Sequence, residues 1–133
     1  MDVDVHFSHP AAAVGLSTGL INVKNSVEFT DKHGLRGLWG KDWPAGAKDT
    51  IDKKQEPVGM GIYIPDSVLR RELPADADNY PFVIGTNGCD LSYKLTYSSD
   101  DETFGYHNSK DWFGFLKSWR RDIEHPVEVT VEK

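Results

Sequence analysis

The segment DLSYKLTY, residues 90–97, has the most regular pattern in the chain and decides the predicted fold. Its leucines and tyrosines alternate with serine, lysine and threonine, which is the period-2 pattern of a β-strand with one buried face. We expect its apolar side chains to form the inner face of a central strand: Leu91, Tyr93, Leu95 and Tyr97. A polar turn at residues 98–101 and a return over residues 104–106 would complete a β-hairpin.

Shorter alternating segments lie on both sides of this strand and predict a chain made of many short strands. We expect these further strands at residues 3–7, 21–29, 35–39, 58–64 and 127–131. Gly59 and Gly61 interrupt one of them. Glycines in a strand indicate a bulge or a close approach of the backbone to a neighbouring element.

The segments between these strands have weaker patterns. Asp66 and Ser67 can cap one helical turn that runs to Glu72, and residues 73–81 resemble a surface loop. Residues 117–123 fit either a helix or a strand. Many short strands with little helical periodicity indicate an all-β fold, a single-domain antiparallel β-sandwich of about eight to ten strands. The domain would span residues 1–133, with residues 1–19 as an N-terminal extension or an edge strand.

The composition argues against several classes of function. The net charge of -6 opposes binding to nucleic acid, because that binding needs Lys and Arg to neutralise phosphates. It also opposes attraction to anionic lipids, but it leaves neutral and zwitterionic membranes open. Cys89 is the single cysteine, so an internal disulfide is excluded, and we expect a structural thiol of low reactivity.

The N-terminal residues do not resemble a targeting sequence. They include Asp2 and Asp4 and lack a basic stretch followed by an apolar run. No apolar run reaches the roughly 18 residues of a membrane-spanning helix. We therefore expect cytoplasmic synthesis without a signal peptide, and release to the exterior by another route stays open.

The common motifs of enzymes are missing from the chain. There is no Gly-rich loop ending in Gly-Lys-Ser/Thr and no dinucleotide fingerprint. His6 and His9 are close in sequence, but no His-x-x-x-His pair lies on a credible helix. Asp100, Asp101 and Glu102 form either a solvated turn or a calcium site. We expect no catalytic residues, no metal site and no cofactor, and hence no enzyme. A glycosidase with paired carboxylates is the enzymatic alternative.

Residues 37–49 are the strongest candidate for a binding segment. They contain Trp39 and Trp43 among three glycines, a proline, two lysines and two aspartates. This composition indicates the end of a strand that turns into a structured loop, where an indole can have one apolar face and one hydrated edge. Alternatively, each tryptophan is a core residue beneath the loop.

Adding polar and aromatic residues from a second loop completes the predicted site. The sequence predicts a lipid- or sugar-binding face made of Trp39, Lys41, Asp42, Trp43, Lys48, Asn108 and Trp112. Tryptophan rings suit a membrane interface, and nearby lysines can meet a phosphate-bearing headgroup. The same rings could stack on a sugar while Asp and Asn side chains bind its hydroxyls.

Two separated stretches resemble the aegerolysins, small acidic β-sandwich proteins of the actinoporin-like group. One is Trp39-Gly40-Lys41 followed by Gly46-x-Lys48-Asp49, and the other is Gly85-Thr86-x-Gly88 followed by Asp90-Leu91. An early strand over residues 21–25 and a final valine-rich strand over residues 127–131 are also similar. The chain departs from the family at residues 107–112, which lack its Cys and Pro, and it lacks the Cys-Gly-Arg that precedes Gly-Thr.

The resemblance implies a function as well as a fold. Aegerolysins bind membrane sphingolipids, need no cofactor, and in some cases form pores with a larger perforin-like partner. The chain would then be a cytolysin-like protein that binds a sphingolipid-type headgroup. The alternative is a carbohydrate-binding, lectin-like module or a protein-interaction β-sandwich module, in either case without catalytic activity.

Overall fold

The computed structural model describes residues 1–11, 15–47 and 55–132, which form eight strands and one helix. The strands are β1 (Asp2–His6), β2 (Leu16–Ile21), β3 (Val23–Thr30), β4 (Leu35–Pro44), β5 (Pro57–Tyr63), β6 (Leu69–Glu72), β7 (Asn79–Ile84) and β8 (Asp90–Ser99), and the helix is α1 (Ser109–Glu124). The strands confirm the all-β, sandwich-like prediction. No described helix is both long and apolar enough to cross a membrane.

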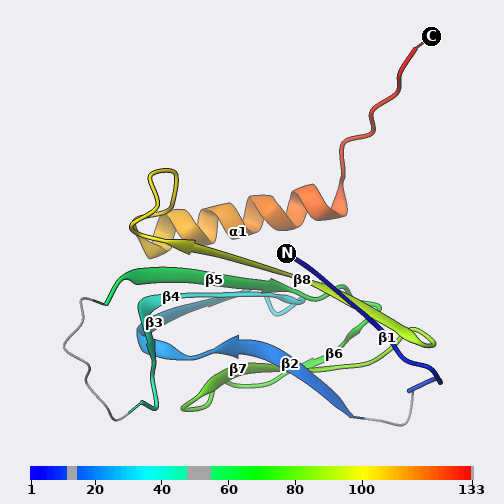
Figure 1. Ribbon diagram of the computed structural model, residues 1–133, viewed down its shortest axis with the longest axis horizontal. Coiled ribbons are helices and arrows are strands. Elements are labelled where there is room, and N and C mark those ends of the chain that lie inside the picture. The colour runs from blue at the N-terminus through cyan, green and yellow to red at the C-terminus, as the bar shows by residue number, and fades with distance from the viewer. Residues whose placement is uncertain (12–14, 48–54, 133) are drawn as a thin grey trace.

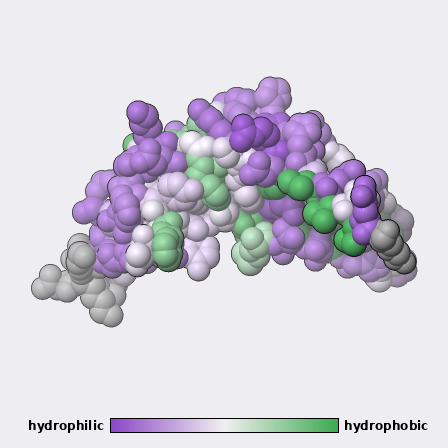
Figure 2. All heavy atoms as spheres, turned by 90° about the horizontal axis from the view of Figure 1, so that it is seen from above, coloured by the Kyte–Doolittle hydropathy of each residue, from purple (hydrophilic) through white to green (hydrophobic). Residues whose placement is uncertain are grey.

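The strands form two antiparallel sheets of unequal width, and α1 lies on the outer face of the wider one (Figure 1). The five-stranded sheet has the order β1-β8-β5-β4-β3, and the three-stranded sheet has the order β2-β7-β6. The molecule therefore has three layers, with the five-stranded sheet in the middle. Seen from the helix side, hydrophilic residues cover most of the surface (Figure 2).

The main core fills the space between the two sheets. Its buried members include Leu38, Ile62 and Ile64 from one side and Phe82 and Ile84 from the other. Strand β7 alternates buried and less buried residues along its whole length, as period-2 geometry requires. Burying this apolar surface supplies the main favourable term in folding.

The second core lies between the five-stranded sheet and α1. Three strand glycines make room for it, because a Cβ on Gly59 would lie 2.6 Å from the Trp112 ring, and Cβ atoms on Gly37 and Gly61 would collide with Leu116. Trp112 and Leu116 are fully buried against these glycines. The prediction that Gly59 and Gly61 allow a close approach is thus confirmed, and the approaching element is the helix.

A charged residue lies inside the sandwich, where the sequence pattern predicts an ordinary strand position. Arg36 is only 1% exposed. Its Nε donates to Glu28 at 2.7 Å, and its Nη1 donates to the carbonyl oxygens of Leu73 and Pro81. The guanidinium also lies over the Tyr80 ring, 5.0 Å from its centroid. These contacts satisfy a charge that would otherwise be costly to bury.

Strand β8 confirms most of the prediction for residues 90–97. Leu91, Tyr93 and Leu95 belong to the core between the sheets. Tyr97 was predicted on the buried face but is 75% exposed. The strand pairs with β1 and β5, and β5 is the middle strand of the sheet. The three-stranded sheet is too narrow to cover every inward position of the wider one, and this explains the exposure of Tyr97.

Four local predictions are wrong. Residues 100–105 are turns and bends and residues 106–107 are irregular, so no return strand forms at residues 104–106. Residues 66–68 form a turn followed by β6, not a helical turn. Residues 37–44 continue strand β4 and do not leave it as a loop. Residues 127–131 alternate like a strand but are exposed and form no strand among the described residues, because no neighbouring strand lies beside them.

Candidate functional site

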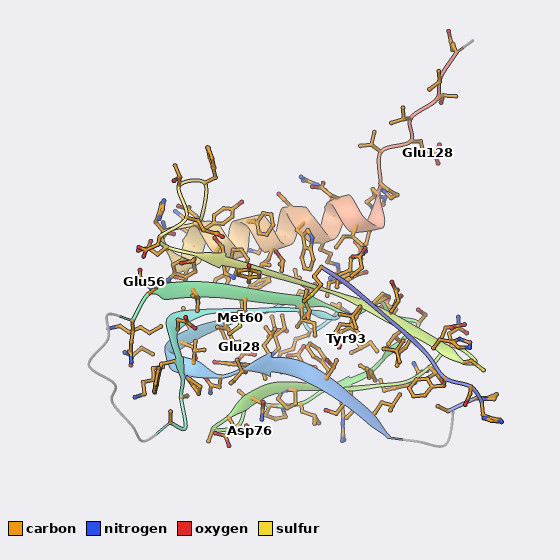
Figure 3. All side chains as sticks on the ribbon, in the orientation of Figure 1. Glu28, Glu56, Met60, Asp76, Tyr93 and Glu128 are labelled. Atoms are coloured by element: carbon orange, nitrogen blue, oxygen red, sulfur yellow. The ribbon has the colours of Figure 1, made fainter. Side chains whose placement is uncertain are left out.

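One end of the five-stranded sheet gathers several of the predicted binding residues. Lys41, Asp42 and Trp43 end strand β4, and the Asp42 amide donates to the Glu56 carbonyl just before β5. The Asp100 amide, just after β8, donates to the Pro57 carbonyl at 2.9 Å. Strands β4 and β8 therefore end where β5 begins, and Figure 3 shows Glu56 at this end of the sheet. We call this region, residues 41–44, 56–57 and 99–108, the loop end.

The segment between β8 and α1 is held in place by its own polar side chains. The Glu102 carboxylate accepts hydrogen bonds from the Ser99 amide and the Ser98 hydroxyl. His107 Nδ1 lies 2.9 Å from the Asp100 carboxylate. This bonding fixes the turn conformation that the acidic cluster was expected to have. The described residues contain no group of three or more His, Cys, Asp or Glu side chains that could hold a metal ion.

Asn108 has a structural role at the loop end. It is the N-cap of α1, and its Oδ1 accepts a hydrogen bond of 2.9 Å from the Asp111 amide. A capping side chain satisfies one of the free N–H groups at the start of a helix. Asn108 therefore fixes the start of α1, and its direct contact with a ligand stays a prediction.

Trp112 was predicted on an exposed face but is fully buried, so the three tryptophans do not share one exposed surface. Its Nε1 donates to the Met60 carbonyl, and its ring stacks on Phe115 at a centroid distance of 5.2 Å. Trp39 is half-buried and packs in the same helix–sheet core. For Trp39 the core alternative is correct, because its ring packs between the sheet and α1, and Trp112 is a core residue of α1 itself.

Trp43 differs from the other two predicted tryptophans. Its side chain is half-buried at the loop end. Its Nε1 is buried and has no hydrogen-bond partner among the described residues. Lys41 and Asp42 beside it are exposed, and Lys48 lies outside the described residues. Of the described members of the predicted set, Lys41, Asp42 and Asn108 are therefore exposed, and Trp43 is half-buried.

Phe104 is the aromatic residue of the loop end that sequence reasoning missed. Its side chain is 99% exposed, more than any other large apolar residue in the described chain. The predicted hairpin placed it on a return strand with one buried face. Its position between the acidic run at residues 100–102 and Gly105 was the available signal for a turn.

A polar cleft lies at the opposite end of strand β8. It has a volume of about 410 Å³. Six polar side chains line it, and we name it the polar cleft: Asp4, His6, Ser67, Asn87, Asp90 and Ser92. His6 Nδ1 lies 2.7 Å from the Asp90 carboxylate, and both side chains are exposed. The antiparallel pairing of His6 with Asp90 in β1 and β8 brings these residues together, and no sequence motif predicted this contact.

Cys89 occupies the turn that leads into β8. Its carbonyl oxygen accepts a hydrogen bond of 2.8 Å from the Phe7 amide, and its side chain is half-buried as a free thiol. The residue therefore joins the turn to the end of the first strand. Its low reactivity stays a prediction.

Comparison with known proteins places the chain in a family without assigning it an activity. No curated protein and no solved structure matched the chain. The aegerolysin resemblance accordingly stays a prediction. A family model described as a domain of unknown function, DUF4861, matches residues 1–129. The match covers almost the whole sequence, and the chain therefore belongs to the DUF4861 family.

Proposed function

We propose that this chain is a non-catalytic binding domain whose loop end docks on zwitterionic membrane surfaces that display phosphocholine headgroups. Phe104 and Trp43 are its aromatic anchors, and Lys41, two residues before Trp43, supplies a cation. The observation that carries the proposal is the near-complete exposure of Phe104 at the same end of the sheet as Trp43. An aromatic ring held in water gains free energy when it enters an apolar environment.

The charges around Phe104 favour a zwitterionic surface. Asp100, Asp101 and Glu102 precede the ring, so an anionic lipid would be repelled there. The quaternary ammonium of choline suits this setting, because it is attracted both to aromatic faces and to nearby carboxylates. The exposed Lys41 can meet the headgroup phosphate.

The buried Trp112 supports this surface without touching the ligand. Trp112 fixes the first turn of α1 on β5 through its bond to the Met60 carbonyl. Asn108 caps the same turn, so the segment that carries Phe104 is held at both ends. Anchors on a supported loop lose less conformational freedom on binding than anchors on a free one. A perforin-like partner would act after this step and is not needed for it.

Liposome sedimentation tests the proposal. The parent chain should pellet with phosphatidylcholine–sphingomyelin vesicles more than with phosphatidylglycerol vesicles. Phe104→Ser should weaken that binding by about tenfold or more, as expected for the loss of an aromatic anchor. Phe104→Trp should retain it, and Val27→Ser, which changes a half-exposed valine of edge strand β3, should leave it unchanged. Equal pelleting of the parent and a folded Phe104→Ser variant would refute the proposal.

The polar cleft favours a second candidate function, the binding of a glycan. Carboxylate, amide and hydroxyl groups converge on a space large enough for a sugar ring. A glycan array with the parent chain and Asp90→Ala separates the two candidates. Binding that depends on Asp90 and not on Phe104 supports the glycan, and the opposite dependence supports the membrane.

A further inference from the structure

An apolar groove opens where the narrow sheet fails to cover the wide one. It has a volume of about 360 Å³. Its lining comes from the inward side of the five-stranded sheet, the edge strand β2 and the N-terminus: Met1, Leu20, Met60, Leu95, Thr96 and Tyr97. Strand β2 pairs with β7 on one side only, so the other edge of β2 has no strand partner among the described residues.

Exposure along strand β8 marks how far this opening extends. The inward residue Leu91 is 6% exposed, and Leu95 is half-buried. Tyr97, two positions further along the same face, is 75% exposed. The three-stranded sheet therefore does not cover Tyr97. A strand added to the free edge of β2 would lie over these side chains.

The same chain contains a segment with the pattern of such a strand. Val127, Val129 and Val131 alternate with polar residues at 128, 130 and 132. All three valines are more than 80% exposed. Figure 3 shows Glu128 on a segment that runs away from both sheets. Three valines on one face of an unpaired extended segment lack the partner strand and the apolar surface that would complete a sheet interface.

The dimensions and polarity of the segment and the groove match. Five residues in extended form span about 16 Å, and β2 contains six residues. Pairing with β2 would place the valine face toward Leu20 and Leu95 and leave Glu128 and Thr130 in water. Strand addition supplies main-chain hydrogen bonds, and the alternating side chains supply specificity.

The chain's own segment cannot reach its own groove in the observed arrangement. Helix α1 packs on the outer face of the five-stranded sheet, whereas the groove lies on the inner face. The three residue steps from Glu124 at the end of α1 to Val127 span at most about 11 Å. Packed layers lie about 10 Å apart and the groove lies beyond the five-stranded sheet, so the segment would have to pass around that sheet to reach it.

We infer that residues 127–131 of a second copy of this chain add to the free edge of β2 and fill the apolar groove. Reciprocal exchange of the two segments produces a closed dimer, because each copy offers one groove and one strand. The dimer involves neither Phe104 nor the polar cleft, so it is independent of the ligand at either site.

Sedimentation velocity and light scattering of the full chain test this inference. The parent should show a concentration-dependent dimer. Val129→Asp should raise the dimer dissociation constant about tenfold or more, because the added carboxylate would enter the groove. Thr130→Asp is the matched control, since it adds the same charge on the opposite face of the segment and should leave the dimer intact. Both positions are exposed, so both variants should keep the parent's circular dichroism spectrum.

Mixing variants tests the exchange itself. Tyr97→Asp blocks the groove but keeps the segment, whereas Val129→Asp blocks the segment but keeps the groove. Each variant alone should be a monomer, and the mixture should form heterodimers through the one intact pairing. A parent that stays monomeric at every concentration overturns the inference, including a monomer whose segment folds back on its own chain. Equal loss of dimer in Val129→Asp and Thr130→Asp also overturns it, as does a mixture without heterodimers.

Discussion

The two faces of the five-stranded sheet show two ways of covering the same strands. On the outer face, Gly37, Gly59 and Gly61 flatten the surface, and α1 fills it with Trp112 and Leu116. On the inner face, larger side chains meet a sheet of only three strands. The outer face is closed along the helix, whereas the inner face is closed around Phe82 and open at Tyr97.

The difference teaches that exposure here depends on the width of the covering layer as well as on residue type. Tyr97 lies on the strand face predicted to be buried, but no strand packs opposite it. Trp112 lies near polar loop residues, but it is buried where α1 packs on the sheet. Whether an aromatic residue lies in the core or at the surface therefore depends on which element packs over it. Four substitutions would break or sharpen this comparison.

Trp112→Ala should have the largest effect, because it removes a fully buried side chain from the centre of the contact between α1 and the sheet. Loss of a fully buried tryptophan should lower the free energy of unfolding by about 3–5 kcal/mol. Urea unfolding followed by circular dichroism measures this change. Phe104→Ala is the control, because this side chain is almost fully exposed, and it should change the free energy of unfolding by less than about 0.5 kcal/mol. Similar losses in the two variants would mean that the packing of Trp112 on the sheet does not stabilise the position of α1.

Arg36→Leu tests the inner face at its buried charge. The change removes the Arg36 donor from the Leu73 and Pro81 carbonyls, although the Leu73 amide still donates to Pro81, and it removes the partner of Glu28. We expect a loss of roughly 3 kcal/mol in the free energy of unfolding. Glu28→Gln, which keeps an acceptor oxygen at a partly exposed position, should lose less. A neutral or stabilised Arg36→Leu variant would show that apolar packing can replace this network.

Gly59→Ala tests whether the outer face must be flat. The added methyl group would lie 2.6 Å from the Trp112 ring, whose Nε1 is bonded to the Met60 carbonyl and cannot move freely. Overpacking of this kind should cost about 1–3 kcal/mol. Gly114→Ala, on the exposed side of α1 with no atom within 4 Å of the new Cβ, should instead stabilise the protein by up to about 1 kcal/mol. Thermal melts of both variants would give opposite shifts.

The fold could be predicted from the sequence where the hydrophobic pattern of a strand reflects a single apolar layer packed against it. Strand β8 shows clear alternation because each of its residues faces either the core or the helix side. Residues 117–123 fitted either a helix or a strand because Trp119 and Ile123 pack on a sheet that the local sequence does not reveal. The tail at residues 127–131 shows the limit of this reasoning, since alternation predicts a strand only where a partner strand is present.

The candidate site was predictable in part. Trp43, Lys41 and Asp42 follow one another in sequence, so a single strand end carries all three. Phe104 joins them only because β5 connects the ends of β4 and β8, which is a property of the topology. The contact of His6 with Asp90 joins residues 84 positions apart. Distant pairs of this kind depend on strand register, which residue types alone do not fix.

Tyr63→Phe should have the smallest effect, and its effect depends on pH. Tyr63 Oη donates to Glu124 at 3.0 Å, so it fixes the far end of α1 on the same face that Trp112 holds at the near end. Burial, with the hydrogen bond to Glu124 adding to it, raises the pKa of Tyr63 to about 12. At neutral pH the loss of this bond should cost about 1 kcal/mol.

The sign of the pH dependence follows from the raised pKa of Tyr63. Folding favours the protonated phenol, so its contribution is complete below the unfolded pKa of about 10 and is lost as the pH rises through about 12. Between about pH 9 and pH 11 the parent should lose roughly 1 kcal/mol more unfolding free energy than Tyr63→Phe. Tyr97→Phe, which changes an exposed phenol, should follow the parent curve. If the parent and Tyr63→Phe lose stability in parallel, the phenol does not hold the end of α1, and the outer face is closed by Trp112 and Leu116 alone.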